Sequence, residues 1–401
     1  MSFNSRILFL LGSGISIPAG LPKTSELTQK ILSGIDVVRH TDGIYYLSED
    51  PSGYFLTDEY VPRIKLFLER LKREIDSYYK NSRETNYEDI YYLAAQIRDS
   101  ELGEYDNPAL NVLISEISLD IAPLLKSDEN GTRENWTLSE LTDEACNYIY
   151  DIVWHSLIKQ PKQLDYLSSV FDAYFDKALS HIDICTLNHD TLLEQYLKLY
   201  LSENPIQVVD GFGPLVNDSR FWDSNLFLSE KIKVHSLKLH GSISWFKIHN
   251  DNEGEKIVIP PLGWDIDNIR NRQEQLQRPA GRRPLILAGT FNKMLGYTQG
   301  IFADLYCQFH NSLERTNSLV VCGYSFHDKG INMQIAEWLF AERQHRLFVI
   351  HSDPENLLRS ARGAISNNWK EWQEKHQLYT IPKMIEGVSW NEISSYLKRN
   401  E

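Results

Sequence analysis

Short apolar runs alternate with segments of helical spacing along this chain, and this alternation constrains its fold more than any other feature. The runs lack the polar-apolar alternation of a half-exposed strand, so they predict strands that are buried on both faces. Strands that alternate with helices form a parallel sheet with helices on both sides. We therefore predict an α/β fold, a Rossmann-like doubly wound parallel sheet. The predicted strands lie within residues 6–11, 181–187, 236–246, 283–290, 317–322 and 346–351.

A long stretch between the first two predicted strands has a different character. Between about residues 36 and 179, apolar residues recur every three to four positions in five successive segments, which indicates amphipathic helices and no strand. We expect two domains: a nucleotide-binding domain made of residues 1–35 and 180–401, and a helical insertion made of residues 36–179.

Charge and cysteine content exclude several classes of protein. The net charge of −14 argues against sequence-independent nucleic-acid binding, which needs Lys and Arg to neutralise phosphates. The one short basic stretch, residues 278–284, has the proline and glycine content of a loop. The four cysteines form no C-x-x-C pair, so we expect neither structural zinc nor a disulfide framework. With no run long enough for a signal peptide or membrane span, we expect a cytoplasmic protein.

Every predicted strand ends in a polar cluster. In a doubly wound sheet these clusters lie at the carboxyl edge of the strands, where ligands bind. The clusters are Gly12-Ser13-Gly14-Ile15-Ser16, Thr186-Leu187-Asn188-His189-Asp190, His240-Gly241-Ser242, Gly289-Thr290, Gly323-Tyr324-Ser325-Phe326 and His351-Ser352-Asp353.

The first cluster has two interpretations. Glycines followed by a helix can bring backbone N–H groups close to a pyrophosphate. The same residues can also form only a tight turn, because Gly12-Ser13-Gly14 lacks the third glycine of the dinucleotide fingerprint. The residues of this segment alone leave both interpretations open.

The clusters together resemble the motifs of the sirtuin superfamily. Residues 12–16 stand where sirtuins carry Gly-Ala-Gly-x-Ser, residues 186–190 where they carry Thr-Gln-Asn-x-Asp, residues 239–241 where they carry the catalytic His-Gly, and residues 323–325 where they carry Gly-Thr-Ser. Two features of sirtuin deacetylases are missing. Gly20-Leu21-Pro22 is not followed by an arginine-bearing motif, and the zinc-binding cysteine pairs are absent. The helical insertion and "GYSFHDKGIN" look like the prokaryotic sirtuin-like NAD hydrolases of antiphage defence.

The resemblance implies that NAD is the substrate. We expect no metal, because the cysteines lack zinc spacing and nicotinamide leaves as a neutral base. It implies a catalytic group made of Asn188, His240 and Asp190, with Asn188 on the water or a ribose hydroxyl and His240 as general base. Asp328 is assigned with Asn332 to the adenosine side. The bland alternatives are that Asn188 and Asp190 cap the following helix, that His240 is structural, and that Ser16 and Ser325 form turns. The expected NAD-binding residues are Gly12, Ser13, Gly14, Ser16, Gly323, Ser325, Asn332, Ser352 and Asp353.

The expected function is that of an antiphage effector that depletes NAD. The helical insertion presents more amphipathic faces than one sheet can cover, so we expect a homo-oligomer that also docks to a partner. The resemblance implies that this partner is a HerA-type ATPase. The charge and the short apolar runs predict no direct nucleic-acid or membrane contact. Two alternatives remain: a sirtuin-type protein deacylase or ADP-ribosyltransferase, and a non-catalytic sensor of NAD or ADP-ribose.

Overall fold

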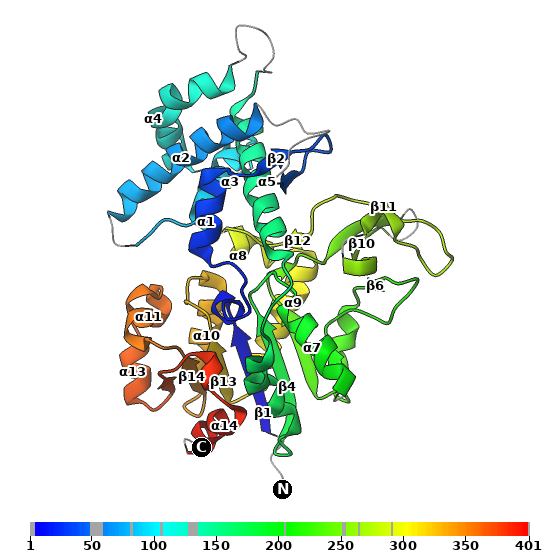
Figure 1. Ribbon diagram of the computed structural model, residues 1–401. Helices are drawn as coiled ribbons and strands as arrows, with labels where there is room; N and C mark the ends of the chain where they lie inside the picture. Colours follow the sequence, from blue (N-terminus) through cyan, green and yellow to red (C-terminus); the bar gives the residue numbers. More distant parts are fainter. Residues whose placement is uncertain are drawn as a thin grey trace. The chain divides into compact units, whose positions relative to one another are not determined.

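The structure is a computed structural model that describes residues 5–48, 59–80, 83–104, 107–126, 135–203, 206–250, 254–263, 265–289 and 292–399. The chain forms two compact units (Figure 1). The sheet unit consists of Met1–Leu21, Gln160–Leu287 and Lys293–Glu401. The helical unit consists of Pro22–Lys159 and Ala288–Asn292.

A seven-stranded parallel sheet forms the centre of the sheet unit, which confirms the predicted doubly wound α/β fold. Five predicted strands are adjacent in it, and β15 and β5 at its edges were not predicted. The strand order is β15 (Leu378–Ile381), β14 (Arg346–Ile350), β13 (Ser318–Cys322), β1 (Ser5–Leu11), β4 (Leu179–Thr186), β7 (Val234–Lys238) and β5 (Val208–Val209).

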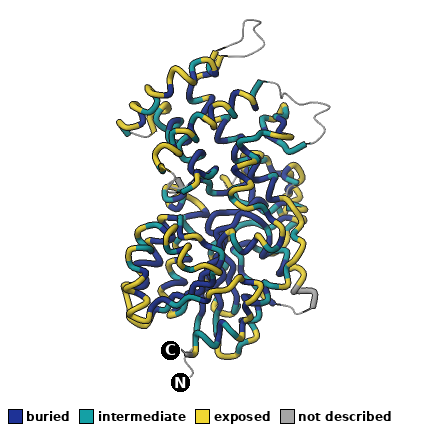
Figure 2. The backbone as a smooth tube through the Cα atoms, turned by 60° about the vertical axis from the view of Figure 1, so that its left-hand side comes forward, coloured by how far each residue is buried: buried dark blue, intermediate teal, exposed yellow. Residues whose placement is uncertain are grey.

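Alternate residues of each strand enter two different hydrophobic clusters, one on each face of the sheet. In β1, Leu8 and Leu10 belong to one cluster, and Phe9 and Leu11 belong to the other. Figure 2 shows these central strands as buried. Both faces are covered, which is why the strands are apolar without alternation. The first face packs against α9 (Gly300–Glu314), α10 (Lys329–Ala341) and α13 (Trp369–Glu374), and the second against α6 (Ser168–Phe171), α7 (Leu192–Glu203) and α14 (Trp390–Arg399).

The predicted strand at residues 283–290 is wrong as a member of this sheet. Only Leu285–Ile286 is a strand, β12, and it pairs antiparallel with β8 (Gly241–Ser242). Of its polar end, Gly289 belongs to the helical unit, and Thr290 lies outside the described residues. A separate four-stranded antiparallel sheet contains β11 (Arg278–Pro279), β9 (Phe246–Asn250), β10 (Gly254–Ile259) and β6 (Arg220–Phe221).

The helical unit contains five helices and a small hairpin among its described residues. The helices are α1 (Thr24–Ser33), α2 (Tyr60–Tyr79), α3 (Tyr87–Glu101), α4 (Pro108–Leu125) and α5 (Leu138–Leu157). The sequence predicted no strand here, but β2 (Val37–Arg39) and β3 (Tyr45–Leu47) form a hairpin. Strands of three residues are too short to show a period. The hairpin is joined to α5 by a hydrogen bond from the backbone N–H of Tyr45 to the side-chain carboxylate of Asp151, at 2.9 Å.

The boundaries between the two units differ from the expected domain boundaries, which lay after residue 35 and after residue 179. Helix α1 belongs to the helical unit, and residues from 160 onward belong to the sheet unit. The amphipathic segment at 163–179 is not one helix but the short helical turns Asp165–Leu167, Ser168–Phe171 and Asp172–Phe175. Leu167, Val170 and Phe171 fill the second hydrophobic cluster beside β1, and the N–H of Lys162 donates to the carbonyl of Ala19 at 3.0 Å. These contacts attach the segment to the sheet unit.

Helix α4 differs from the expectation that no segment approaches a membrane helix. Among the described helices it alone has the length and apolar content needed to cross a membrane, with 18 residues and a mean hydropathy of 1.4. Only 22% of it is buried. Core helices of soluble proteins pass the same test of length and composition.

Candidate functional site

Five polar strand ends meet at one edge of the main sheet. They follow β14, β13, β1, β4 and β7, which are adjacent and parallel. The chain runs from β1 to one side through β4 and β7, and later to the other side through β13 and β14. The crevice of a doubly wound sheet lies where the strand order changes direction in this way. The candidate site is therefore centred on the loop after β1.

The glycines of this loop are explained by close packing of backbone against backbone. A Cβ added at Gly12 would lie 2.5 Å from the carbonyl oxygen of Gly323, and one at Gly14 would lie 2.7 Å from the Gly323 Cα. The Gly12 N–H donates to the Cys322 carbonyl and the Gly14 N–H to the Gly323 carbonyl, both at 2.9 Å. Both amides are thus engaged within the protein, which favours the tight-turn interpretation for these two residues. Ser13 is exposed.

Three side chains from two loops form a buried network beside this turn. The hydroxyl of Ser16 donates to Asp190 Oδ2 at 2.7 Å and accepts from Asn188 Nδ2 at 2.9 Å. Asn188 Nδ2 also approaches the Gly12 carbonyl at 3.1 Å. The other amide atom, Asn188 Oδ1, is buried and has no hydrogen-bond partner among the described residues. A buried acceptor without a donor costs about 1–3 kcal/mol, so this atom is suited to a ligand or a water molecule.

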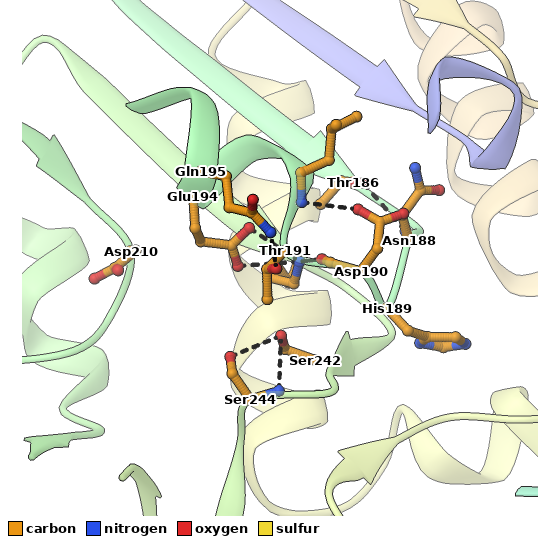
Figure 3. Close-up of polar contacts among 12 residues, drawn as sticks. Thr186, Asn188, His189, Asp190, Thr191, Glu194, Gln195, Asp210, Ser242 and Ser244 are labelled. Carbon is orange, nitrogen blue, oxygen red and sulfur yellow. Dashed lines mark hydrogen bonds and ion pairs between the residues drawn. The ribbon is translucent and has the colours of Figure 1, made fainter. Parts of the chain in front are cut away.

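Asp190 also has the structural role that the bland alternative assigned to it. Its Oδ1 accepts from the backbone N–H of Leu192 at 3.0 Å, at the start of α7. The amide of Asn188 makes no such bond and is directed to the loop after β1 instead. Figure 3 shows Asn188, His189 and Asp190 together at the end of β4. The sequence analysis missed Lys238, a buried lysine of β7 that donates to the Asp190 carbonyl and pairs with Glu194 Oε1 at 3.1 Å.

His240, at the end of β7, is buried and contacts two polar side chains. Its Nε2 lies 2.6 Å from the Tyr297 hydroxyl and 3.1 Å from Asp328 Oδ2. The Tyr297 hydroxyl lies 3.0 Å from the same carboxylate oxygen. Burial alone would raise the pKa of Asp328, but the hydrogen bond and charge of His240, together with the charge of Lys293, lower it well below its usual range. The sequence did not predict this contact between Asp328 and His240.

His189 connects the ends of β4 and β7. Its Nδ1 lies 3.1 Å from the His240 carbonyl oxygen, and the two imidazole rings are 6.0 Å apart between centroids. Burial, with the nearby charges of His240, Lys293 and Lys238, lowers the pKa of His189 well below its usual value. His189 is therefore neutral at physiological pH.

The remaining predicted residues lie at the same edge with different surroundings. Asn332 is fully buried, and its amide accepts from the Tyr324 hydroxyl at 2.8 Å and donates to the Phe326 carbonyl at 2.7 Å. Asp353 caps α11 (Pro354–Ser360) by accepting from the Asn356 N–H at 3.0 Å. Ser325 and Ser352 are exposed. The structure thus joins Gly12, Ser16, Asn188 and Asp190 by direct contacts. None of these hydrogen bonds involves Asn332, Asp353, Ser325 or Ser352.

No group of three or more His, Cys, Asp or Glu side chains that could hold a metal ion occurs among the residues the structure describes. Three of the four cysteines are buried, and Cys307 is exposed. Burial raises the pKa of the Cys322 thiol to about 12 and that of the Cys146 thiol to about 12, so neither is a thiolate near neutral pH.

Comparison with known proteins gives one family match. Residues 183–377, slightly less than half of the chain, match the family model described as a SIR2-like domain. This stretch begins within β4, ends just before β15 and includes Asn188, His240 and Asp328. It is therefore similar to SIR2-like domains, in agreement with the sirtuin resemblance of its motifs.

Among solved structures, a triple mutant of a Sir2 homologue in complex with 2′-O-acetyl ADP ribose aligns with 99% of this chain and 93% of its own, at 12% sequence identity and a TM-score of 0.37. No curated protein sequence matches the chain.

Proposed function

We propose that this protein hydrolyses NAD to nicotinamide and ADP-ribose at the carboxyl edge of the main sheet. The observation that carries the proposal is Asn188 Oδ1, a buried acceptor without a donor, fixed by Gly12 and Ser16 in the loop where NAD-binding sheets hold their ligand. The SIR2-like match over residues 183–377 supports NAD as the ligand. His240 stands at the end of β7, next to β4, and supplies the group that can accept a proton.

The proposed reaction breaks the bond between the ribose C1′ and the nicotinamide nitrogen. The bonding electron pair stays on that nitrogen, so the pyridinium leaves as neutral nicotinamide and needs little acid assistance. Water attacks C1′ of the oxocarbenium-like ribose, its oxygen becomes the C1′ hydroxyl of ADP-ribose, and its proton passes to His240 and then to solvent. Asn188 Oδ1 accepts from the attacking water or from a ribose hydroxyl, and Ser16 holds the Asn188 amide in place.

The direct test is to measure nicotinamide release from NAD by chromatography. We expect His240→Ala and Asn188→Ala each to slow turnover by about 10²–10⁴-fold, the usual loss for one acid-base or orienting group. Two exposed residues, His310 and Asn225, give the control variants His310→Ala and Asn225→Ala, which should keep full activity. Wild-type turnover in both test variants, with NAD binding intact, would show that the mechanism is wrong.

The same assay separates the other candidate chemistries. NAD labelled in the adenosine half gives free ADP-ribose if water is the acceptor, and labelled protein if the activity is ADP-ribosyl transfer. Deacylation would require an acyl-lysine peptide for any nicotinamide release. Binding of NAD without release of nicotinamide under any condition would indicate the non-catalytic sensor.

The proposal includes no metal. The leaving group departs as a neutral base without a Lewis acid, and the cysteines lack zinc spacing. We expect a chelator neither to unfold the protein nor to abolish activity. Tightly bound stoichiometric zinc in elemental analysis, with activity lost on its removal, would contradict this.

We further propose that the enzyme is a cytoplasmic antiphage effector that depletes NAD and is controlled by assembly with itself and with a HerA-type ATPase. The resemblance to the sirtuin-like NAD hydrolases of antiphage defence supports this role. Within the helical unit, Val112 and Leu119 of α4 are 60% and 86% exposed, and they lie seven residues apart on one face of the helix. Exposed apolar residues of this kind are typical of interfaces.

A further inference from the structure

His240 is held by a tyrosine and an aspartate that come from distant parts of the sheet unit. Tyr297 lies just after α8 (Asn292–Gly296), and Asp328 is the N-cap residue of α10. All three side chains are buried: His240 is 3% exposed, Tyr297 5% and Asp328 6%. Hydrogen bonds between buried polar groups are strong and leave few alternative arrangements.

The distances decide which ring nitrogen of His240 carries the proton. A phenol has one hydrogen, and Tyr297 has Asp328 Oδ2 at 3.0 Å as an acceptor. The Tyr297 oxygen is then an acceptor for His240 Nε2 at 2.6 Å, and Asp328 Oδ2 is a second acceptor for the same nitrogen at 3.1 Å. Nε2 therefore carries the hydrogen. In the neutral imidazole Nδ1 is then the nitrogen with the lone pair.

We infer that Asp328 and Tyr297 are positioning residues that fix His240 in the Nε2–H tautomer, so that Nδ1 accepts the proton of the attacking water. This inference rests on the proposed hydrolysis and assigns two residues to it. Asp328 also stabilises the imidazolium that forms when the proton arrives, because a buried carboxylate lies against the ring. Neither residue is proposed to touch NAD.

The titratable groups around the His240 ring each keep one charge state near neutral pH. Asp328 is an anion, because its pKa is well below the usual range. Burial, and the charge of Asp328, raise the pKa of Tyr297 well above its usual value, so it stays protonated. His189 faces the ring from the loop after β4 and is neutral near physiological pH. Lys293 of α8 contributes a nearby positive charge.

The substitution Asp328→Asn removes the negative charge of this side chain and keeps its role as the cap of α10. Asp328 Oδ1 accepts from the Ile331 N–H at 3.0 Å and caps α10. Asparagine caps a helix as well as aspartate does, so Asp328→Asn keeps this bond. The amide nitrogen then faces His240 and donates to Nε2. This favours the Nδ1–H tautomer, which cannot accept a proton at Nδ1.

We expect Asp328→Asn to lower kcat by about 10²–10⁴-fold with little change in the KM for NAD. The acidic limb of the residual kcat profile should move to lower pH, because the ring has lost the carboxylate that favours its charged form. Tyr297→Phe should have a smaller effect, since Asp328 still contacts Nε2. Asp223→Asn is the control, because Asp223 caps another helical turn and is exposed.

Two outcomes separate this inference from the proposed function. Loss of activity in His240→Ala, with a wild-type kcat and pH profile in Asp328→Asn, would overturn the inference and leave the hydrolysis standing. Absence of nicotinamide release from NAD by the unmodified protein would overturn the hydrolysis itself.

A measurement on the unmodified protein tests the tautomer if Asp328→Asn does not fold. Nitrogen NMR of histidine-labelled protein, with His240→Gln to assign the signals, reports which ring nitrogen is protonated in the neutral form. We expect Nε2–H. An Nδ1–H ring would overturn the inference.

Discussion

The hydroxyl of Ser16 donates to Asp190 Oδ2 at 2.7 Å, across 174 residues of sequence. The bond joins the loop after β1 to the loop after β4, and the same hydroxyl accepts from Asn188 Nδ2. A serine is needed here because its hydroxyl is donor and acceptor at once. Ser16 therefore sets the orientation of the Asn188 amide, whose Oδ1 is buried and has no hydrogen-bond partner among the described residues.

Ser16→Ala removes the one group that bridges Asp190 and Asn188. We expect the free energy of unfolding to fall by about 1–3 kcal/mol, because a buried carboxylate loses a hydrogen bond. NAD turnover should fall as well, since the Asn188 amide is then free to rotate. Urea denaturation and nicotinamide release measure the two effects. The matched control is Ser395→Ala, whose hydroxyl only bonds to a carbonyl of its own helix. Equal behaviour of the two variants would contradict this role for Ser16.

Gly12→Ala tests whether the glycine loop is shaped by packing. The new Cβ would lie 2.5 Å from the Gly323 carbonyl oxygen and 2.6 Å from the Tyr324 Cα, and both are backbone atoms that cannot rotate away. We expect a loss of about 1–3 kcal/mol in unfolding free energy without NAD present. Gly281→Ala should be close to neutral, because nothing lies within 4 Å of its added Cβ. If Gly12→Ala weakens only NAD binding and leaves stability unchanged, the loop acts as a phosphate cradle instead.

The strand ends could be predicted from the sequence because β1, β4, β7, β13 and β14 are buried on both faces. A continuous apolar run followed by polar residues therefore predicts both the parallel sheet and the edge at which the candidate site lies. Tyr297 follows no strand and joins His240 only through the fold, so no local pattern indicates it. Asp328 was noticed, but its partner His240 is 88 residues away in sequence, so no local pattern could indicate their contact. The β2–β3 hairpin was missed because its strands have three residues each.

A partly buried histidine of the helical unit should make stability depend on pH. Burial lowers the pKa of His155 to about 4, and its ring stacks on Trp154 with 4.5 Å between centroids. Between about pH 6.5 and pH 4 the unfolded chain binds a proton at this position and the folded chain does not. The free energy of unfolding should therefore fall as the pH drops through this window, by at most about 3 kcal/mol.

His155→Phe should remove this part of the pH dependence while keeping the ring contacts. The measurement is urea denaturation from pH 4 to pH 7, compared between the variant and the wild type. His310→Phe is the control, because His310 is exposed. A wild-type slope in His155→Phe would show that the ring is protonated in the folded protein.

The last prediction concerns assembly through the helical unit. The proposed depletion of NAD requires that the protein be held inactive until it is needed, and the chain's large addition to the sheet unit is the helical unit. Helix α4 leaves Val112 and Leu119 exposed, although Ile117 and Ile121 on its other side are buried.

If this face is an interface, Leu119→Glu should weaken self-association or partner-dependent activation, because a charge at a buried interface costs several kcal/mol unless it is paired. It should leave the fold intact, since the Leu119 side chain is 86% exposed. Light scattering at micromolar concentration gives the mass, and NAD turnover with and without the partner ATPase gives the activation. Leu276→Glu, at an exposed leucine of the sheet unit, is the control. A wild-type protein that is strictly monomeric and fully active without any partner would remove the assembly hypothesis.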